Sequence, residues 1–162
     1  MRKSIFPLAL LSAALVACAS PATTGMLVRD FGSFNGAKVE LTEEGGIAGL
    51  SSIRVVSHDD RSFAYAQRRI CSTGCAAPLD SASGVLSPAA ADSLFSIIFA
   101  ASPYELANDY GTTPNSADMV SYSLRVTTDQ GVKTIRADDG TMPPRMRRIV
   151  EGVHGTISAA RQ

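Results

Sequence analysis

Five short segments of the chain have the pattern of β-strands, through alternation of hydrophobic and polar residues or through richness in β-branched residues. The clearest case is 119–127, where Val120, Tyr122, Leu124 and Val126 alternate with polar residues. Val39 and Leu41 alternate with polar residues in the first segment, as Phe63 and Tyr65 do in the third, and the second is rich in β-branched residues. The expected strands are residues 38–44, 52–56, 62–70, 119–127 and 132–137.

Two further segments space their apolar residues as one face of an α-helix does. The first begins after Ser87, a good N-cap residue, with Pro88 at the first helical position. The second begins around Pro143-Pro144. The residues expected to be buried are Ala91, Leu94, Phe95 and Ile98 in the first helix, where Ile97 and Phe99 widen the buried face, and Met146, Ile149, Val150 and Val153 in the second.

The remaining segments are expected to be loops, including Asp80 to Gly84 and Glu105 to Ala117. The resulting order is strand–strand–strand–helix–strand–strand–helix. This order predicts an α+β fold, in which an antiparallel β-sheet carries two α-helices packed on its apolar face. No internal repeat is visible.

The N-terminus has the features of a bacterial lipoprotein signal peptide, predicted at residues 1–17. Arg2 and Lys3 are followed by an apolar run that is shorter than the ~20 residues needed to span a bilayer. The run closes with Leu15-Val16-Ala17-Cys18, where small residues directly precede a cysteine. Plain secretion, which needs no cysteine there, is the alternative. The sequence predicts that Cys18 is lipidated and becomes the mature N-terminus.

The residue after Cys18 is Ala19 rather than Asp, which argues against retention at the inner membrane. We therefore expect a protein anchored by lipid in the cell envelope, at the outer membrane and facing the periplasm. Residues 18–36 comprise the lipidated cysteine and a tether, since they are rich at first in Ser, Thr, Pro, Gly and Ala. Residues 37–158 are expected to form the folded domain.

The charge balance indicates no polyanionic partner. Removal of residues 1–17, whose basic residues are Arg2 and Lys3, leaves 145 residues with 13 basic and 15 acidic side chains. No basic stripe rises above this balance. Nucleic acid is therefore not expected as a partner, and the membrane is expected to contact the protein through the lipid anchor alone.

With Cys18 lipidated, Cys71 and Cys75 remain as an even pair in an oxidising compartment, which favours a structural disulfide. The Cys-x-x-x-Cys spacing differs from that of thioredoxin-like redox sites. Metal binding by the pair is disfavoured because neither His58 nor His154 lies at ligand spacing from it. No cofactor or metal is expected.

A glycine-rich stretch, Gly45-Gly46-Ile47-Ala48-Gly49-Leu50, separates the first two expected strands. It is typical of a β-hairpin whose glycines supply positive φ angles at the tip. Such a tip is usually only a turn. It lacks the Lys-Ser/Thr of a phosphate-binding loop and offers only backbone groups and small apolar side chains to a partner.

The chain resembles a known family in four segments. These are the glycine-rich stretch, residues 121–126, the run 138–144 and the apolar helix after it. From about Lys38 to Val153, the chain is similar to the emfourin family, small protein inhibitors of thermolysin-like metallopeptidases. Within this region, residues 60–85 carry the cysteine pair and look like an insertion, because emfourin-like chains have no such cysteine loop there.

The resemblance implies that the hairpin tip, Gly45 to Leu50, contacts a metallopeptidase. Thermolysin-like enzymes hold a catalytic zinc ion in an open cleft and prefer a bulky apolar side chain just beyond the scissile bond. The tip glycines would allow close backbone approach, and Ile47 or Leu50 would fill the apolar pocket. The carboxylate of Glu43 or Glu44 would be able to approach the zinc.

Catalysis by this chain is not expected, because the two histidines are accompanied by none of the local motifs of hydrolases. The alternative to an inhibitor is a non-catalytic structural or assembly lipoprotein of the cell envelope. The inhibitor hypothesis requires Ile47 or Leu50 to be exposed at the tip. The structural hypothesis allows residues 60–85 to cover it.

Overall fold

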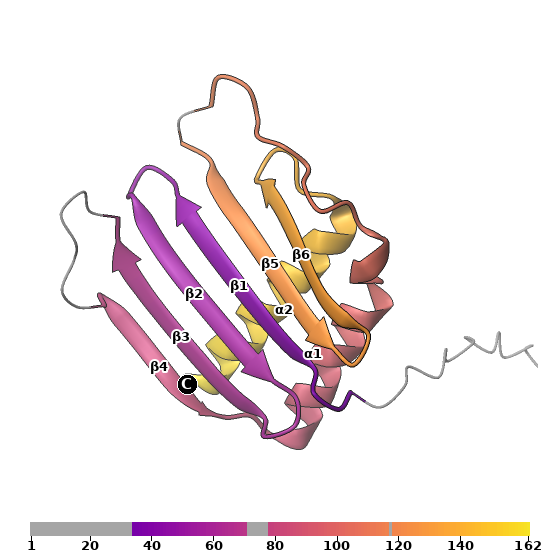
Figure 1. Ribbon diagram of the computed structural model, residues 1–162. Coiled ribbons are helices and arrows are strands. Elements are labelled where there is room, and N and C mark those ends of the chain that lie inside the picture. The colour runs from indigo at the N-terminus through magenta and orange to yellow at the C-terminus, as the bar shows by residue number, and fades with distance from the viewer. Residues whose placement is uncertain (1–33, 71–77, 117) are drawn as a thin grey trace, which may run out of the picture. The chain divides into compact units, whose positions relative to one another are not determined.

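The computed structural model describes residues 34–70, 78–116 and 118–162. They form a six-stranded antiparallel β-sheet with two α-helices on one of its faces (Figure 1). The α+β class and the two helices are as predicted, and the sheet has one strand more than the five expected. The strands are β1 (Lys38–Gly45), β2 (Leu50–Ser57), β3 (Ser62–Arg69), β4 (Asp80–Val85), β5 (Val120–Thr128) and β6 (Gly131–Asp138). The helices are α1 (Pro88–Ala100) and α2 (Pro144–Ala160), and η1 (Pro103–Glu105) is a short 3-10 helix.

The strand order across the sheet is β4-β3-β2-β1-β5-β6, so β1 is an interior strand between β2 and β5. The last residue of β1, Gly45, pairs with Leu50 of β2 on one side and with Val120 of β5 on the other. The antiparallel pairing therefore brings the β1–β2 turn, the end of β3 and the starts of β4 and β5 to the same end of the sheet (Figure 1).

The core lies between the sheet and the helices. The sheet contributes alternate residues of its strands, as their period-two pattern requires. The residues at the centre of both predicted stripes are buried, and Ile157 extends the α2 stripe by one turn. Of the two residues expected to widen the α1 face, Phe99 is half-buried, whereas Ile97 is 37% exposed and does not belong to it. The side chains of Leu41, Phe95, Leu94, Ile98, Leu124, Ile135, Met146 and Ile149 have no exposed surface.

The start of α1 also follows the prediction. The Ser87 Oγ accepts a hydrogen bond of 3.2 Å from the Ala90 N–H, and Pro88 occupies the first helical position. This cap satisfies one of the backbone donors that a helix N-terminus leaves without a partner.

The prediction that Asp80 to Gly84 form a loop is wrong, because these residues form most of β4. The pairing with β3 runs from Asp80 opposite Gln67 to Val85 opposite Ser62. β4 is an edge strand of small residues, so no apolar alternation reveals it in the sequence. Gly84 has a packing role, since a Cβ there would lie 2.9 Å from the Phe63 ring.

Phe34, from the segment expected to act as a tether, packs against the folded domain. The Phe34 ring lies 4.9 Å from His58 and 5.0 Å from Phe99, measured between ring centroids. The predicted signal peptide, Cys18, Cys71 and Cys75 all lie outside the described residues. Across residues 34–70, 78–116 and 118–162, the helices are too short or too polar to cross a membrane.

Candidate functional site

The β1–β2 turn consists of residues 46–49, here called the tip turn. It is closed by a 3.0 Å hydrogen bond from the Gly49 N–H to the Gly46 carbonyl, which leaves Ile47 and Ala48 at the centre. As the sequence predicts, the glycines take positive φ angles: 114° at Gly45, 69° at Gly46 and 56° at Gly49. L-residues with side chains rarely adopt such angles.

Neighbouring strands hold the tip turn from both sides. The Gly46 N–H donates to the Met119 carbonyl at 3.3 Å, and the Ile70 N–H donates to the Gly49 carbonyl at 2.7 Å. These contacts come from the residues next to β5 and β3, on the two flanks of the hairpin. The turn is therefore anchored to the sheet more firmly than an isolated hairpin end would be.

The centre of the tip turn presents an aliphatic side chain to solvent. Ile47 is 89% exposed, the largest exposure of any large hydrophobic residue in the described chain. Ala48 is exposed as well, whereas Leu50 is half-buried. At the same end of the sheet, Ile70 is 51% and Leu79 59% exposed. Exposed aliphatic residues gathered at one end of a domain indicate a surface for binding another molecule.

Beneath the tip turn, on the side of the sheet that carries the helices, lies a pocket of about 300 Å³. The backbone of the turn forms one wall of this pocket. Glu43, Ser52, Arg54, Gln67 and Tyr122 contribute polar groups to the rest of the lining. The inward-facing positions of β1 are thus apolar at Val39 and Leu41 and become polar at Glu43, below the tip turn.

Glu43 is the centre of this polar group. Its carboxylate accepts a 2.7 Å hydrogen bond from the Ser52 hydroxyl, pairs with the Arg54 guanidinium, and lies 2.7 Å from Nε2 of His154 on α2. This close contact does not have the geometry of a hydrogen bond. The Glu43 side chain is only 13% exposed.

Burial by itself raises the pKa of Glu43, but the contacts with His154, Ser52 and Arg54 outweigh it and lower the pKa from 4.5 to about 2. The carboxylate is therefore ionised and engaged within the domain. The expectation that Glu43 approaches a zinc ion is thereby corrected, because this side chain serves to hold β1, β2 and α2 together. Glu44, the next residue, is exposed.

We predict that Glu43→Gln lowers the free energy of unfolding by about 1.5–3 kcal/mol at pH 7, the usual contribution of hydrogen bonds to a charged group. Because folding lowers the pKa, the carboxylate stabilises the fold fully above pH 4.5 and loses its effect as the pH falls towards 2. The difference between wild type and Glu43→Gln in urea unfolding should shrink over that range. Glu44→Gln, on the exposed neighbour, is the matched control and should change stability by less than about 0.5 kcal/mol. A difference independent of pH would contradict this account of Glu43.

The run Asp138–Thr141 that contributes to the family resemblance fastens loops to the sheet. Asp138 is buried and accepts hydrogen bonds from Thr113, Gly140 and Thr141, and the backbone N–H of Thr113 is the main cause of its strongly lowered pKa. Asp139 accepts hydrogen bonds from the Tyr122 hydroxyl at 2.8 Å and the Val120 N–H at 3.1 Å. The run therefore supports the β5 side of the tip turn.

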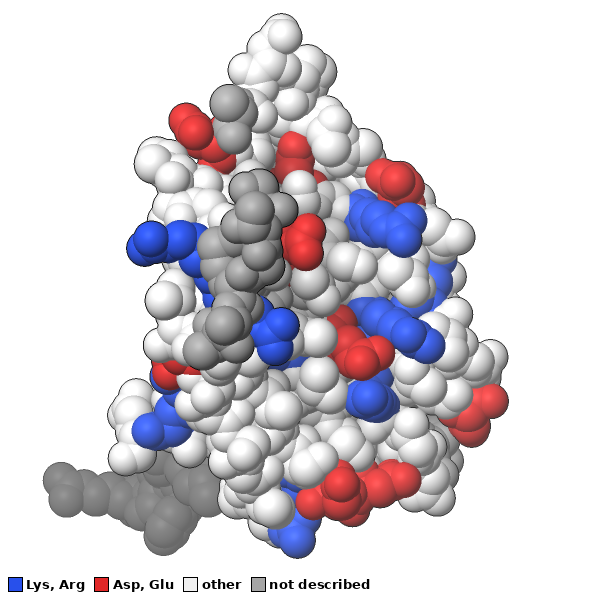
Figure 2. Space-filling view, turned by 60° about the vertical axis from the view of Figure 1, so that its left-hand side comes forward, with Lys and Arg blue, Asp and Glu red and all other residues white. Residues whose placement is uncertain are grey.

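The arginines of α2 are largely occupied within the domain. Arg145 donates to the carbonyls of Ala101 and Ser102 and to Glu105, and Arg147 donates to the Asp139 carbonyl. On the face shown in Figure 2, acidic and basic residues of the described chain are interspersed. This distribution agrees with the even charge balance of the sequence.

No protein-family model matches the chain, and no curated protein is significantly similar to it. The resemblance to emfourins stays a prediction. Within residues 34–70, 78–116 and 118–162, no group of three or more His, Cys, Asp and Glu side chains is placed to bind a metal ion.

The group around Glu43 is the part of the site that sequence reasoning missed. One signal for it is present, because Glu43 falls on the same alternate positions as the buried Val39 and Leu41. An acidic residue at an inward position of a central strand requires a polar partner. The sequence does not show that the partners are Arg54 and the distant His154.

Proposed function

We propose that this chain is a lipid-anchored protein inhibitor of a thermolysin-like metallopeptidase, and that the tip turn enters the active-site cleft of that enzyme. The observation that carries this proposal is the 89% exposure of Ile47 at the centre of a turn fixed on both flanks. The resemblance of the sequence to emfourins supplies the class of enzyme.

The tip turn suits such a cleft for two physical reasons. Ile47 can enter the apolar pocket beyond the scissile bond, and burying an aliphatic side chain contributes about 1.5–3 kcal/mol. The turn is also pre-organised by the contacts with Met119 and Ile70, so little conformational entropy is lost on binding. The exposed Ile70 and Leu79 add apolar area around the point of insertion.

Steady-state inhibition tests the proposal. The purified chain is titrated into thermolysin and, as a control for the class of enzyme, into a serine protease of similar substrate preference. We expect saturable inhibition of thermolysin alone. Absence of inhibition across several thermolysin-like enzymes would reject the proposal and favour a structural or assembly lipoprotein of the cell envelope.

The anchor is a separate prediction. We expect metabolic labelling with a fatty acid to mark the wild-type protein and not Cys18→Ser, because the cysteine thiol is the acylated group. The labelled protein is expected in the outer-membrane fraction. Equal labelling of the two proteins would contradict lipidation at Cys18.

The remaining cysteines give a further prediction. Cys71 and Cys75 are expected to form a disulfide in material isolated from an oxidising compartment. The mass of the unreduced protein should then be two hydrogens lower than the mass after reduction. Alkylation of both thiols without prior reduction would show that the bond is absent.

A further inference from the structure

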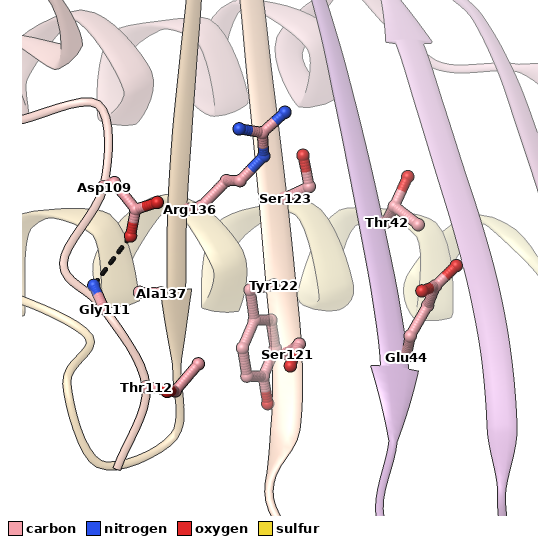
Figure 3. Close-up of a pocket in the computed structure, with 10 residues that line it drawn as sticks. All are labelled: Thr42, Glu44, Asp109, Gly111, Thr112, Ser121, Tyr122, Ser123, Arg136 and Ala137. Atoms are coloured by element: carbon pink, nitrogen blue, oxygen red, sulfur yellow. Dashed lines mark hydrogen bonds between the residues drawn. The ribbon is translucent and has the colours of Figure 1, made fainter. Parts of the chain in front are cut away.

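A second pocket lies on the opposite, helix-free face of the sheet (Figure 3) and has a volume of about 380 Å³. Its floor is made by short hydroxyl side chains of β1 and β5 together with Arg136 of β6. The loop before β5 forms a wall beside Arg136, and Glu44 lies at the far side of the pocket (Figure 3). The hydroxyl side chains of the floor are those of Thr42, Ser121 and Ser123, and Thr112 belongs to the loop that forms the wall.

The wall of this pocket is fixed to the edge of the sheet. The Tyr110 N–H donates to the Arg136 carbonyl and the Arg136 N–H donates to the Asn108 carbonyl, both at 2.9 Å, which makes a short parallel bridge. The Thr141 hydroxyl donates to the Gly111 carbonyl at 3.1 Å. The pocket is therefore already formed in the unbound chain, as is usual for small-molecule sites.

Arg136 differs from the other basic side chains of β1, β5 and β6. Lys38 and Arg125 form ion pairs with Glu40, and Lys133 donates to Asn108. The guanidinium of Arg136 has no ion pair or hydrogen bond with another side chain among the described residues, and it also lines an adjoining hollow on the same face. Its planar group of donors remains available for a carboxylate.

Acidic residues limit the charge of a ligand. Asp109 lines the pocket beside Arg136, where its carboxylate accepts a 2.7 Å hydrogen bond from the Gly111 N–H. Glu44 is exposed and has no ion-pair partner in the described chain. A doubly charged phosphate would be repelled by these carboxylates, whereas a single carboxylate with a cationic group directed at Glu44 would complement both ends of the pocket.

We propose that this pocket binds a short peptide, with its C-terminal carboxylate on Arg136 and its amino group on Glu44. The sheet register places Arg136, Ser123 and Thr42 in one row across β6, β5 and β1, and Glu44 lies two residues further along β1. The Cα atoms of Arg136 and Glu44 are therefore separated by two inter-strand spacings across the sheet and by two residues along β1. Together these displacements amount to about 12 Å. An extended tripeptide spans about 10 Å and matches this separation, while the charges of a single amino acid lie too close together.

Calorimetry and amide chemical shifts of the purified chain test this site. The probes are tri-alanine, tri-alanine amide and N-acetyl-tri-alanine at one ionic strength. Tri-alanine should bind saturably and shift the amides of Thr42 and Ser123, and removal of either charge from the peptide should weaken binding about tenfold. The result does not depend on inhibition of a protease, so the two proposals can fail separately.

Variants assign the two ends of the pocket. Arg136→Gln should weaken the binding of tri-alanine about tenfold. It should not weaken the binding of tri-alanine amide any further, because that peptide has no carboxylate for Arg136 to bind. Glu44→Gln should weaken tri-alanine but leave N-acetyl-tri-alanine unchanged. Arg148→Gln, an exposed arginine on α2, is the control and should bind as the wild type does. Absence of saturable binding, or equal affinity for tri-alanine and its amide, would overturn the proposal even without the variants.

Discussion

Replacing Ile47 with Asp is expected to weaken inhibition of a thermolysin-like enzyme about 100-fold or more. The substitution removes an aliphatic contact of about 1.5–3 kcal/mol and places a charge where the partner offers an apolar pocket. Because Ile47 is 89% exposed, the stability of the free chain should change by less than about 0.5 kcal/mol. The measurement is the inhibition constant, together with a thermal melt to show that the variant folds.

Val132→Asp is the matched control for this experiment. Val132 is 54% exposed and lies at the start of β6, at the end of the sheet away from the tip turn. The same change of an exposed aliphatic residue to Asp should there leave inhibition unchanged. If Ile47→Asp inhibits as well as Val132→Asp does, the tip turn is not the contact.

Gly45→Ala is expected to destabilise the fold by about 2–4 kcal/mol. Its φ angle of 114° is strained for any residue with a Cβ, and that Cβ would lie 2.6 Å from the Met119 carbonyl oxygen. Strain of this kind costs on the order of 1–3 kcal/mol, and the backbone clash adds to it. Urea unfolding of the two proteins gives the difference in the free energy of unfolding.

Gly49→Ala separates the cost of the positive φ angle from the cost of the clash with Met119. Gly49 also has a positive φ angle, 56°, but a Cβ there would meet no atom within 4 Å. This substitution should cost only about 1–2 kcal/mol, the ordinary penalty of the left-handed conformation. Equal losses of stability at Gly45 and Gly49 would show that contact with Met119 does not constrain the hairpin.

The sequence predicted those parts of the fold that repeat a local period. Alternation placed Leu124 and Val126 in the core, and helical spacing placed Phe95 and Ile149 there, since each pattern follows from backbone geometry alone. β4 could not be predicted this way. Its residues are Asp, Ser, Ala, Gly and Val, and they form a strand because β3 offers an open edge.

The candidate site could likewise be predicted only in part. The glycines indicated a turn with positive φ angles, and that prediction is confirmed at Gly45, Gly46 and Gly49. The role of Glu43 was not predicted, because it depends on His154. That residue lies over a hundred positions later in the sequence and reaches the carboxylate only when α2 packs on the sheet. Long-range pairing of this kind leaves no periodic signal in the sequence.

The arginines of α2 offer a check on where the partner binds. Arg145 and Arg147 already bond to carbonyl groups of the domain, so their replacement should act mainly on stability. A charge reversal at the exposed Arg148 should change inhibition little, and only at low salt, as is typical of charges outside the centre of an interface.

Photo-crosslinking from position 47 tests the central claim most directly. A photoreactive residue replaces Ile47 in one variant and Val132 in another, and each is irradiated with thermolysin in the presence and absence of a small zinc-directed active-site inhibitor. The account predicts that position 47 alone crosslinks to residues lining the active-site cleft, and that the small inhibitor suppresses this crosslink. Crosslinks from position 47 that map outside the cleft, or that persist with the cleft occupied, would contradict it.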